Sequence, residues 1–103
     1  MNASFSFVAK LWLYSGKGAW HFVTLPKQTA LDIKILTNND LLPRRGFDSV
    51  KVHVTCRDVS WDTSLFPDSK SGSFLLPISK MIRMKTDLKV EDEAQFKIIV
   101  LSI

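Results

Sequence analysis

The sequence predicts a mainly β protein with two short helices, folded as a closed six-stranded barrel. The first observation is an internal repeat: Trp20–Pro26 and Ser73–Pro77 are β-prone runs that both end in Leu-Pro, with the two steps 51 residues apart (76 − 25). Each run opens a helical stretch, and a turn containing Asp and an apolar strand follow. The second observation is that each half reads strand, strand, helix, strand. Two such units, each with an odd number of strands, can interlock into one barrel that has no exposed edge.

The first repeat covers residues 3–57. Phe5–Trp12 alternates as a strand, and Ser15–Gly18 is a turn whose glycines tolerate a positive φ. Trp20–Leu25 is the return strand of this hairpin. Pro26 suits the first position of a helix that runs to about Thr37. Ser49–Arg57 then alternates as a half-buried strand, with Val50, Val52, Val54 and Cys56 on one face.

The second repeat covers residues 58–103. Its expected elements are a strand over Val59–Phe66, a loop over Pro67–Gly72, a short strand over Ser73–Leu76, a helix opened by Pro77, and a last strand over Glu93–Ile103. The helix pattern places one apolar face on Ile78, Met81, Ile82, Met84 and Leu88. The last strand is apolar on both faces from Ile98, so we expect it to be buried.

Length and composition indicate one barrel domain over residues 1–103. A hydrophobic content of 46% with 23% charged residues is typical of a soluble globular protein, and no apolar stretch approaches a membrane span. The first residues lack the basic and apolar regions of a signal peptide. Cys56 is the sole cysteine, so no internal disulfide can form. We therefore expect a cytoplasmic protein without a membrane partner.

The net charge of +4 comes entirely from the first half of the chain. Residues 1–51 hold seven Lys or Arg and three Asp or Glu, whereas residues 52–103 hold seven of each. Such an excess suits an anionic partner, nucleic acid included. Nucleic-acid binders usually concentrate their basic residues in one stripe, so a solvated basic surface is the preferred interpretation.

The sequence offers no frame for catalysis, and we expect no metal and no cofactor. His53 and Cys56 are three residues apart on one strand, so they point to opposite faces and cannot share a metal ion. Cys56 lies on the apolar face, where burial makes a thiol inert. No serine sits in a Gly-x-Ser-x-Gly turn. We therefore name no catalytic residue and expect binding in place of turnover, although an enzyme stays open.

The aromatic and basic residues allow two interpretations. Trp12, Trp20 and Trp61 are many tryptophans for 103 residues, and Arg44 and Arg45 lie in the longest irregular connection. The preferred interpretation is that the tryptophans fill the barrel while the arginines are solvated. In the other, tryptophan and arginine together stack on a ligand and bind its anionic group.

Four ordered motifs give the chain a resemblance to a known family. They are Gly16–Pro26, Arg44–Val50, Trp61–Pro67 and Gly72–Pro77. Together they resemble a family of small bacterial proteins known only as domain of unknown function nineteen-oh-five. That family is similar in fold to the double-split β-barrels of AbrB-like and MazE-like transcription factors. The resemblance implies that one chain supplies both interlocking units, and it implies no activity.

The leading functional hypothesis is a non-enzymatic binding module for a small anionic or aromatic ligand at one barrel end. Its candidate ligand-binding residues are Trp20, Arg44, Arg45, Trp61, Ser64 and Lys70. The arginines would pair with anionic oxygens and the tryptophans would give stacking area. Nucleic-acid binding, by analogy with AbrB-like barrels, is the alternative, and a structural interaction domain is another. A barrel closed by one chain needs no partner, so a monomer fits, and the sequence leaves the oligomeric state open.

Overall fold

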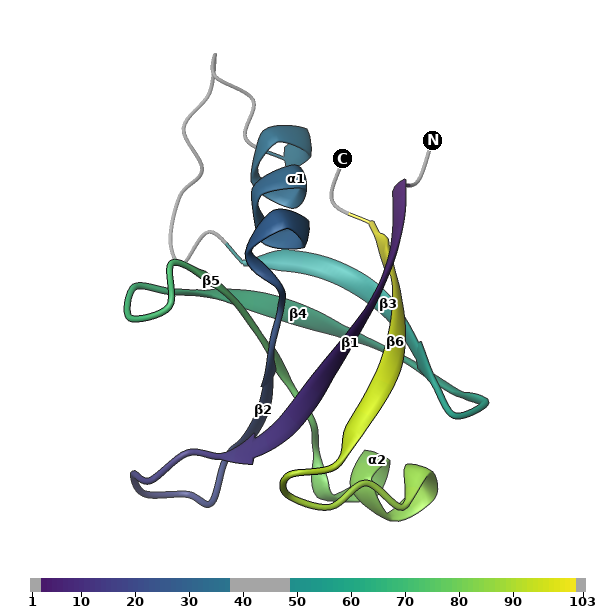
Figure 1. Cartoon of the computed structure of the whole chain (residues 1–103). Helices are drawn as coiled ribbons and strands as arrows, with labels where there is room; N and C mark the ends of the chain where they lie inside the picture. The colour runs from purple at the N-terminus through teal and green to yellow at the C-terminus, as the bar shows by residue number, and fades with distance from the viewer. Residues whose placement is uncertain (1–2, 38–48, 102–103) are drawn as a thin grey trace.

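The structure is a computed structural model that describes residues 3–37 and 49–101, and its secondary structure repeats the order strand, strand, helix, strand (Figure 1). The elements are β1 (Ala3–Leu13), β2 (His21–Thr24), α1 (Lys27–Thr37), β3 (Val50–Cys56), β4 (Val59–Asp68), β5 (Ser73–Pro77), α2 (Lys80–Thr86) and β6 (Glu93–Val100). The mainly β class with two helices is thus confirmed.

The six strands form a closed antiparallel barrel in the order β1-β2-β5-β4-β3-β6, and β6 pairs with β1 to complete the ring. Exchanging β1 with β4, β2 with β5 and β3 with β6 returns the same ring. In the β2–β5 ladder, Thr24 pairs with Leu75, its own counterpart 51 residues on (75 − 24). The two halves of the chain therefore interlock through β2 and β5, as the sequence repeat predicts.

Along β3 and β6, successive side chains point alternately into and out of the barrel, and the inward side chains fill its interior. Val54, Phe96 and Ile98 are fully buried, on strands whose neighbouring positions face outward. The Phe7 ring stacks on Phe96 across the β1–β6 ladder, with 5.7 Å between centroids. Each such aliphatic or aromatic side chain stabilises the fold by about 1.5–3 kcal/mol. Because both halves contribute to this core, neither half has an interior of its own.

The two helices lie at opposite ends of the barrel (Figure 1). α1 begins directly after Pro26, whose carbonyl accepts from Ala30 N at 2.9 Å. α2 does not begin at Pro77, and that prediction was wrong. Pro77 ends β5 opposite Phe22, and the ladder continues because Ile78 N donates to His21 O at 2.9 Å. Ser79 caps the helix instead, its Oγ accepting from Ile82 N.

The apolar face predicted for α2 is also partly wrong. The helix has only seven residues, and Met81 and Met84 are exposed at 64% and 74%. Of the five residues predicted, Ile78, Ile82 and Leu88 are buried, and only Ile82 belongs to the helix. A helix of about two turns buries a single apolar position here, and the chain on either side supplies the other buried residues.

Two strand ends differ from the predicted bounds. β4 continues through Pro67, where a loop was predicted, and Pro67 pairs with Phe74. Proline is tolerated because the β3–β4 ladder stops at Leu65, so this part of β4 pairs on one side only. β6 ends at Val100, and Leu101 is 42% exposed. Within the described residues, no helix has the length and hydrophobicity needed to cross a membrane.

Candidate functional site: an aromatic groove between two hairpins

An apolar surface covers part of the outer wall of the barrel. Trp12 of β1 and Phe22 of β2 are cross-strand partners, and they point outward because their neighbours Leu11 and Val23 face the core. On the other side of β2, Phe66 of β4 and Leu75 of β5 form a second outward pair. The alternation of four neighbouring strands thus collects large apolar side chains outside the barrel.

Phe22 is the centre of an aromatic cluster. The Trp20 ring stacks on it with 6.0 Å between centroids and 7° between planes. Trp12 lies at 5.4 Å with a tilt of 42°, and Tyr14 meets Phe22 edge-on at 6.4 Å. Trp12 is fixed further because its Nε1 donates to Thr24 Oγ1 at 2.9 Å. Such offset and edge-on pairs are each worth about 0.5–1.5 kcal/mol beyond burial.

The glycines of the β1–β2 hairpin leave room for these rings. A Cβ atom at Gly16 would lie 2.2 Å from the Tyr14 ring. A Cβ atom at Gly18 would lie 2.9 Å from Trp20 Nε1, and Gly18 also has a φ of +93°. The turn therefore holds Tyr14 and Trp20 beside Phe22, which a bulkier hairpin sequence would prevent.

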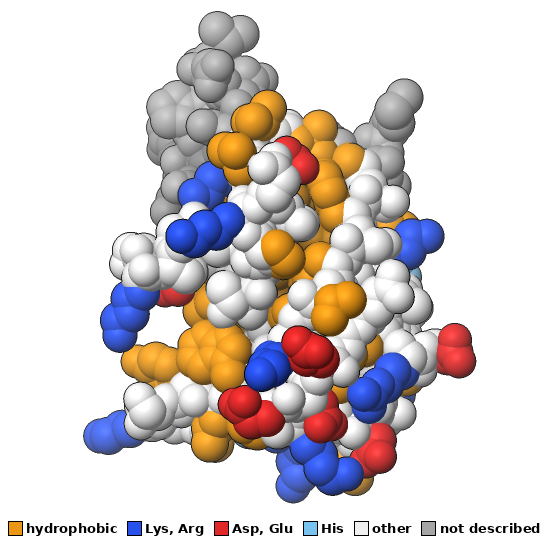
Figure 2. Space-filling model, viewed as in Figure 1, with side chains coloured by type: hydrophobic (Ala, Val, Ile, Leu, Met, Phe, Trp, Pro, Cys, Tyr) orange, Lys and Arg blue, Asp and Glu red, His pale blue; other side chains and the backbone are white. Residues whose placement is uncertain are grey.

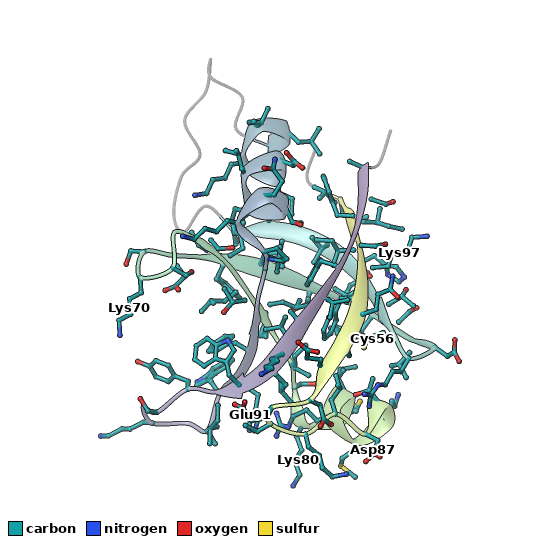
Figure 3. All side chains as sticks on the ribbon, in the orientation of Figure 1. Cys56, Lys70, Lys80, Asp87, Glu91 and Lys97 are labelled. Carbon is teal, nitrogen blue, oxygen red and sulfur yellow. The ribbon has the colours of Figure 1, made fainter. Side chains whose placement is uncertain are left out.

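A hollow of about 570 Å³ lies between this cluster and the β4–β5 hairpin. We call it the aromatic groove, and its walls are Trp12, Leu13, Tyr14, Ser15, Trp20, Phe22, Phe66, Asp68, Ser69, Lys70 and Leu75. Orange hydrophobic side chains border a notch at the lower left of the molecule in Figure 2, and Lys70 projects from the hairpin on the same side in Figure 3. The volume falls within the range of small-molecule sites, about 300–1,000 Å³.

The polar groups of the groove are mainly free donors. Across residues 3–37 and 49–101, Tyr14 Oη, Trp20 Nε1 and Lys70 Nζ have no hydrogen-bond partner in the protein. Asp68 differs, because its Oδ2 accepts from Ser71 Oγ at 2.8 Å and from Ser71 N at 3.2 Å. These bonds hold the pKa of the Asp68 carboxyl below its usual value. The groove thus offers an ammonium, an indole N–H and a phenol beside one ionised, hydrogen-bonded carboxylate.

A second hollow of about 290 Å³ opens at the end of the barrel, beside the start of α2. Trp20 and Trp61 line it, together with Asp62, Thr63, Pro77, Ile78 and Ser79. Trp61 is on the inward face of β4, opposite Val54, and packs partly buried against the core. We call this hollow the end pocket. Trp20 is the residue that lines both hollows.

The structure brings together some of the predicted site residues. Trp20 and Lys70 line the aromatic groove, and Trp20 and Trp61 line the end pocket. Ser64 lines neither hollow and lies opposite Lys51 in the β3–β4 ladder. Arg44 and Arg45 lie outside the described residues.

The preferred interpretation of the tryptophans as barrel filling was wrong for two of the three. Trp12 points outward and Trp20 is 55% exposed, while valine, leucine, isoleucine and phenylalanine fill the interior. Sequence reasoning also missed Trp12, Tyr14, Phe22 and Phe66 as groove residues. A signal existed, since the run from Leu11 to Tyr14 is apolar at every position, although one of its faces must lie outside the barrel.

The chemistry of the remaining reactive groups is limited. Cys56 is buried in the core, as its strand face predicts, and burial raises the pKa of its thiol. His53 is on the opposite face, with its Nδ1 2.6 Å from Asp62 Oδ1. Among the residues that the structure describes, no group of three His, Cys, Asp or Glu side chains could hold a metal ion.

The fold and the site define a class of protein: a closed six-stranded barrel of two interlocked β-β-α-β units that carries an aromatic groove on its outer wall. The chain belongs to the family described as domain of unknown function (DUF1905), whose model matches residues 7–98. The match runs from the middle of β1 into β6, and it confirms the family resemblance seen in the sequence motifs. A comparison with curated proteins found no match.

Proposed function

We propose that this protein is a non-enzymatic binding module for a small, flat aromatic ligand that carries an anionic group. The observation that supports this proposal most is the open aromatic groove, in which stacked rings lie beside the Lys70 ammonium, which donates no hydrogen bond to the described residues. Aromatic walls favour a planar ligand through stacking and burial. Lys70 Nζ and Trp20 Nε1 can donate to an acceptor or an anion on that ligand, while the Asp68 carboxylate in the same groove already accepts from Ser71.

Binding is favoured over turnover by the groups in the groove. Its titratable side chains are Tyr14, Asp68 and Lys70. The hydrogen bonds from Ser71 lower the pKa of Asp68, which makes its carboxylate a weak base at neutral pH. We also assign the protein to the cytoplasm, because its sole cysteine is unpaired and buried, as suits a reducing compartment.

Three dansyl compounds test the proposal. Dansylamide has the flat ring without a carboxylate, and dansylglycine has both. We expect dansylglycine to bind more tightly, with its emission enhanced in the groove. Lys70→Met should weaken dansylglycine about fivefold, the order of one exposed ion pair, and leave dansylamide unchanged. Dansyl-L-phenylalanine is the third compound and is used below.

Lys97→Met is the matched control for Lys70→Met. Lys97 is exposed on the outer face of β6, on the opposite side of the molecule in Figure 3. The Lys97→Met substitution should leave the affinity for dansylglycine unchanged. Equal affinity for dansylamide and dansylglycine, or an equal loss in both lysine variants, would contradict the proposal.

Single-stranded nucleic acid is the second candidate. Trp20 is exposed and stacked, and Lys17 and Lys70 lie on the two hairpins that flank the groove, an arrangement that suits unpaired bases and phosphates. Asp62 and Asp68 in the two hollows oppose a polyanion. An affinity for an oligothymidine that falls steeply with added salt would favour this candidate over the small ligand.

A further inference from the structure

The end pocket and the aromatic groove meet at one side chain, Trp20. Its indole is 55% exposed and stacks on Phe22, the one aromatic contact that the described residues give it. Trp61 forms a wall of the end pocket and makes no ring contact with Trp20 in that part of the chain. The end pocket is thus an open space bounded by two indoles, a shape that accepts a ring.

The two hollows differ in charge. Lys70 and Asp68 both line the aromatic groove, where the Asp68 carboxylate already accepts from Ser71, whereas no Lys or Arg lines the end pocket, where Asp62 is the one charged wall residue among those described. An anionic group can therefore pair with Lys70 in the groove, whereas in the end pocket it would meet the Asp62 carboxylate with no cation beside it. Pro77 and Ile78 add apolar surface to the end pocket, which suits an uncharged ring.

We propose that the two hollows are adjoining subsites for one ligand with two aromatic groups, in which a ring with the anionic group occupies the aromatic groove and an uncharged ring occupies the end pocket. This inference rests on the proposed function and extends it to the shape and charge order of the ligand. Trp20 contacts both parts, Lys70 pairs with the anion, and Trp61 contacts the second ring alone.

Dansyl-L-phenylalanine tests the inference against dansylglycine, because the two compounds differ only by a benzyl group. We expect dansyl-L-phenylalanine to bind about fivefold more tightly, the order of one added aromatic contact. Trp61→Leu should remove this gain and leave dansylglycine unchanged, while Trp61→Phe should retain most of it. Trp20→Leu should weaken both compounds.

The affinity for dansylglycine also reports whether the Trp61→Leu variant is folded. If Trp61→Leu loses dansylglycine binding as well, the Trp61→Phe variant replaces it in the test, because phenylalanine keeps a ring and most of the side-chain volume. The comparison of dansyl-L-phenylalanine with dansylglycine is then made on Trp61→Phe. The inference is overturned if the benzyl group adds no affinity, or if both Trp61 variants weaken the two compounds equally. Binding of dansylglycine with no gain from the benzyl group overturns the inference and leaves the proposed function standing. Failure of every dansyl compound overturns both.

Discussion

Trp20 and Phe22 stack nearly in parallel, with 7° between their ring planes, on the outside of the β1–β2 hairpin. Residues two apart on extended backbone share a face, so the alternation that buries Val23 turns both rings outward. The stacked pair forms part of the wall of the aromatic groove. The groove therefore depends on strand register as much as on residue type.

Phe22→Leu should loosen the cluster, because Phe22 makes ring contacts with Trp12, Tyr14 and Trp20. We expect a loss of about 1–2 kcal/mol in the free energy of unfolding, measured with urea, and a red shift of indole emission. Phe66→Leu is the control, since Phe66 makes no ring contact with the described residues and is 39% exposed. An equal loss of unfolding free energy in the two variants would show that the ring contacts of the cluster add nothing to stability.

Gly16→Ala should affect binding more than stability. The new methyl group would push the Tyr14 ring out of place, while the backbone at Gly16 lies outside the positive-φ region. We expect the affinity for dansylglycine to fall about threefold and the unfolding free energy to change by less than about 0.5 kcal/mol. Gly72→Ala should lower the unfolding free energy and leave the affinity for dansylglycine unchanged. Its φ is +72° and nothing lies near its Cβ position, so backbone strain of about 1 kcal/mol is the main effect.

Ser71→Ala should lower the melting temperature in a pH-dependent way. Ser71 donates to Asp68, and this bond lowers the pKa of the carboxyl from its usual 3.8. A lowered folded-state pKa gives stability that is present above pH 3.8 and lost as the pH falls through the folded-state value. The difference in melting temperature between the variant and the natural protein should therefore be largest at neutral pH and should shrink as the pH falls below 3.8. A difference that stays constant down to strong acid would rule out this linkage.

Phe96→Ala tests whether the two halves share one core. Phe96 is fully buried and stacks on Phe7 from the other half of the chain. We expect a loss of about 3–5 kcal/mol, with circular dichroism and tryptophan fluorescence reporting a single common transition. Val8→Ala, at an outward position that is 58% exposed, should change stability by less than about 0.5 kcal/mol. Two separate transitions would indicate halves that fold independently.

The barrel could be predicted because its signals are local or repeated. Alternation in Val50–Cys56 identified a strand and its buried face, and the two Leu-Pro steps predicted which strands are equivalent. The Pro77 helix start was wrong because the sequence does not reveal the bond from Ile78 N to His21 O, which keeps this segment in the ladder.

The groove was harder to predict because its walls come together only through pairing. Trp12 and Phe66 are 54 residues apart (66 − 12), and the β2–β5 ladder sets them on one face of the barrel. Trp20 and Lys70 were found through residue type alone. Ser64 was chosen in the same way, yet its place on β4 keeps it out of both hollows.

The most direct test of the aromatic groove follows the indole N–H resonances of the three tryptophans while dansylglycine is titrated into ¹⁵N-labelled protein. Trp20 Nε1 should shift most, because it lines the groove with its donor free. Trp12 Nε1 should shift less, because it is bonded to Thr24, and Trp61 Nε1 should respond only to dansyl-L-phenylalanine. The account would be contradicted if the Trp20 Nε1 resonance did not shift. It would also be contradicted if the largest shifts were those of the Leu31 and Ile35 amides, on the exposed face of α1.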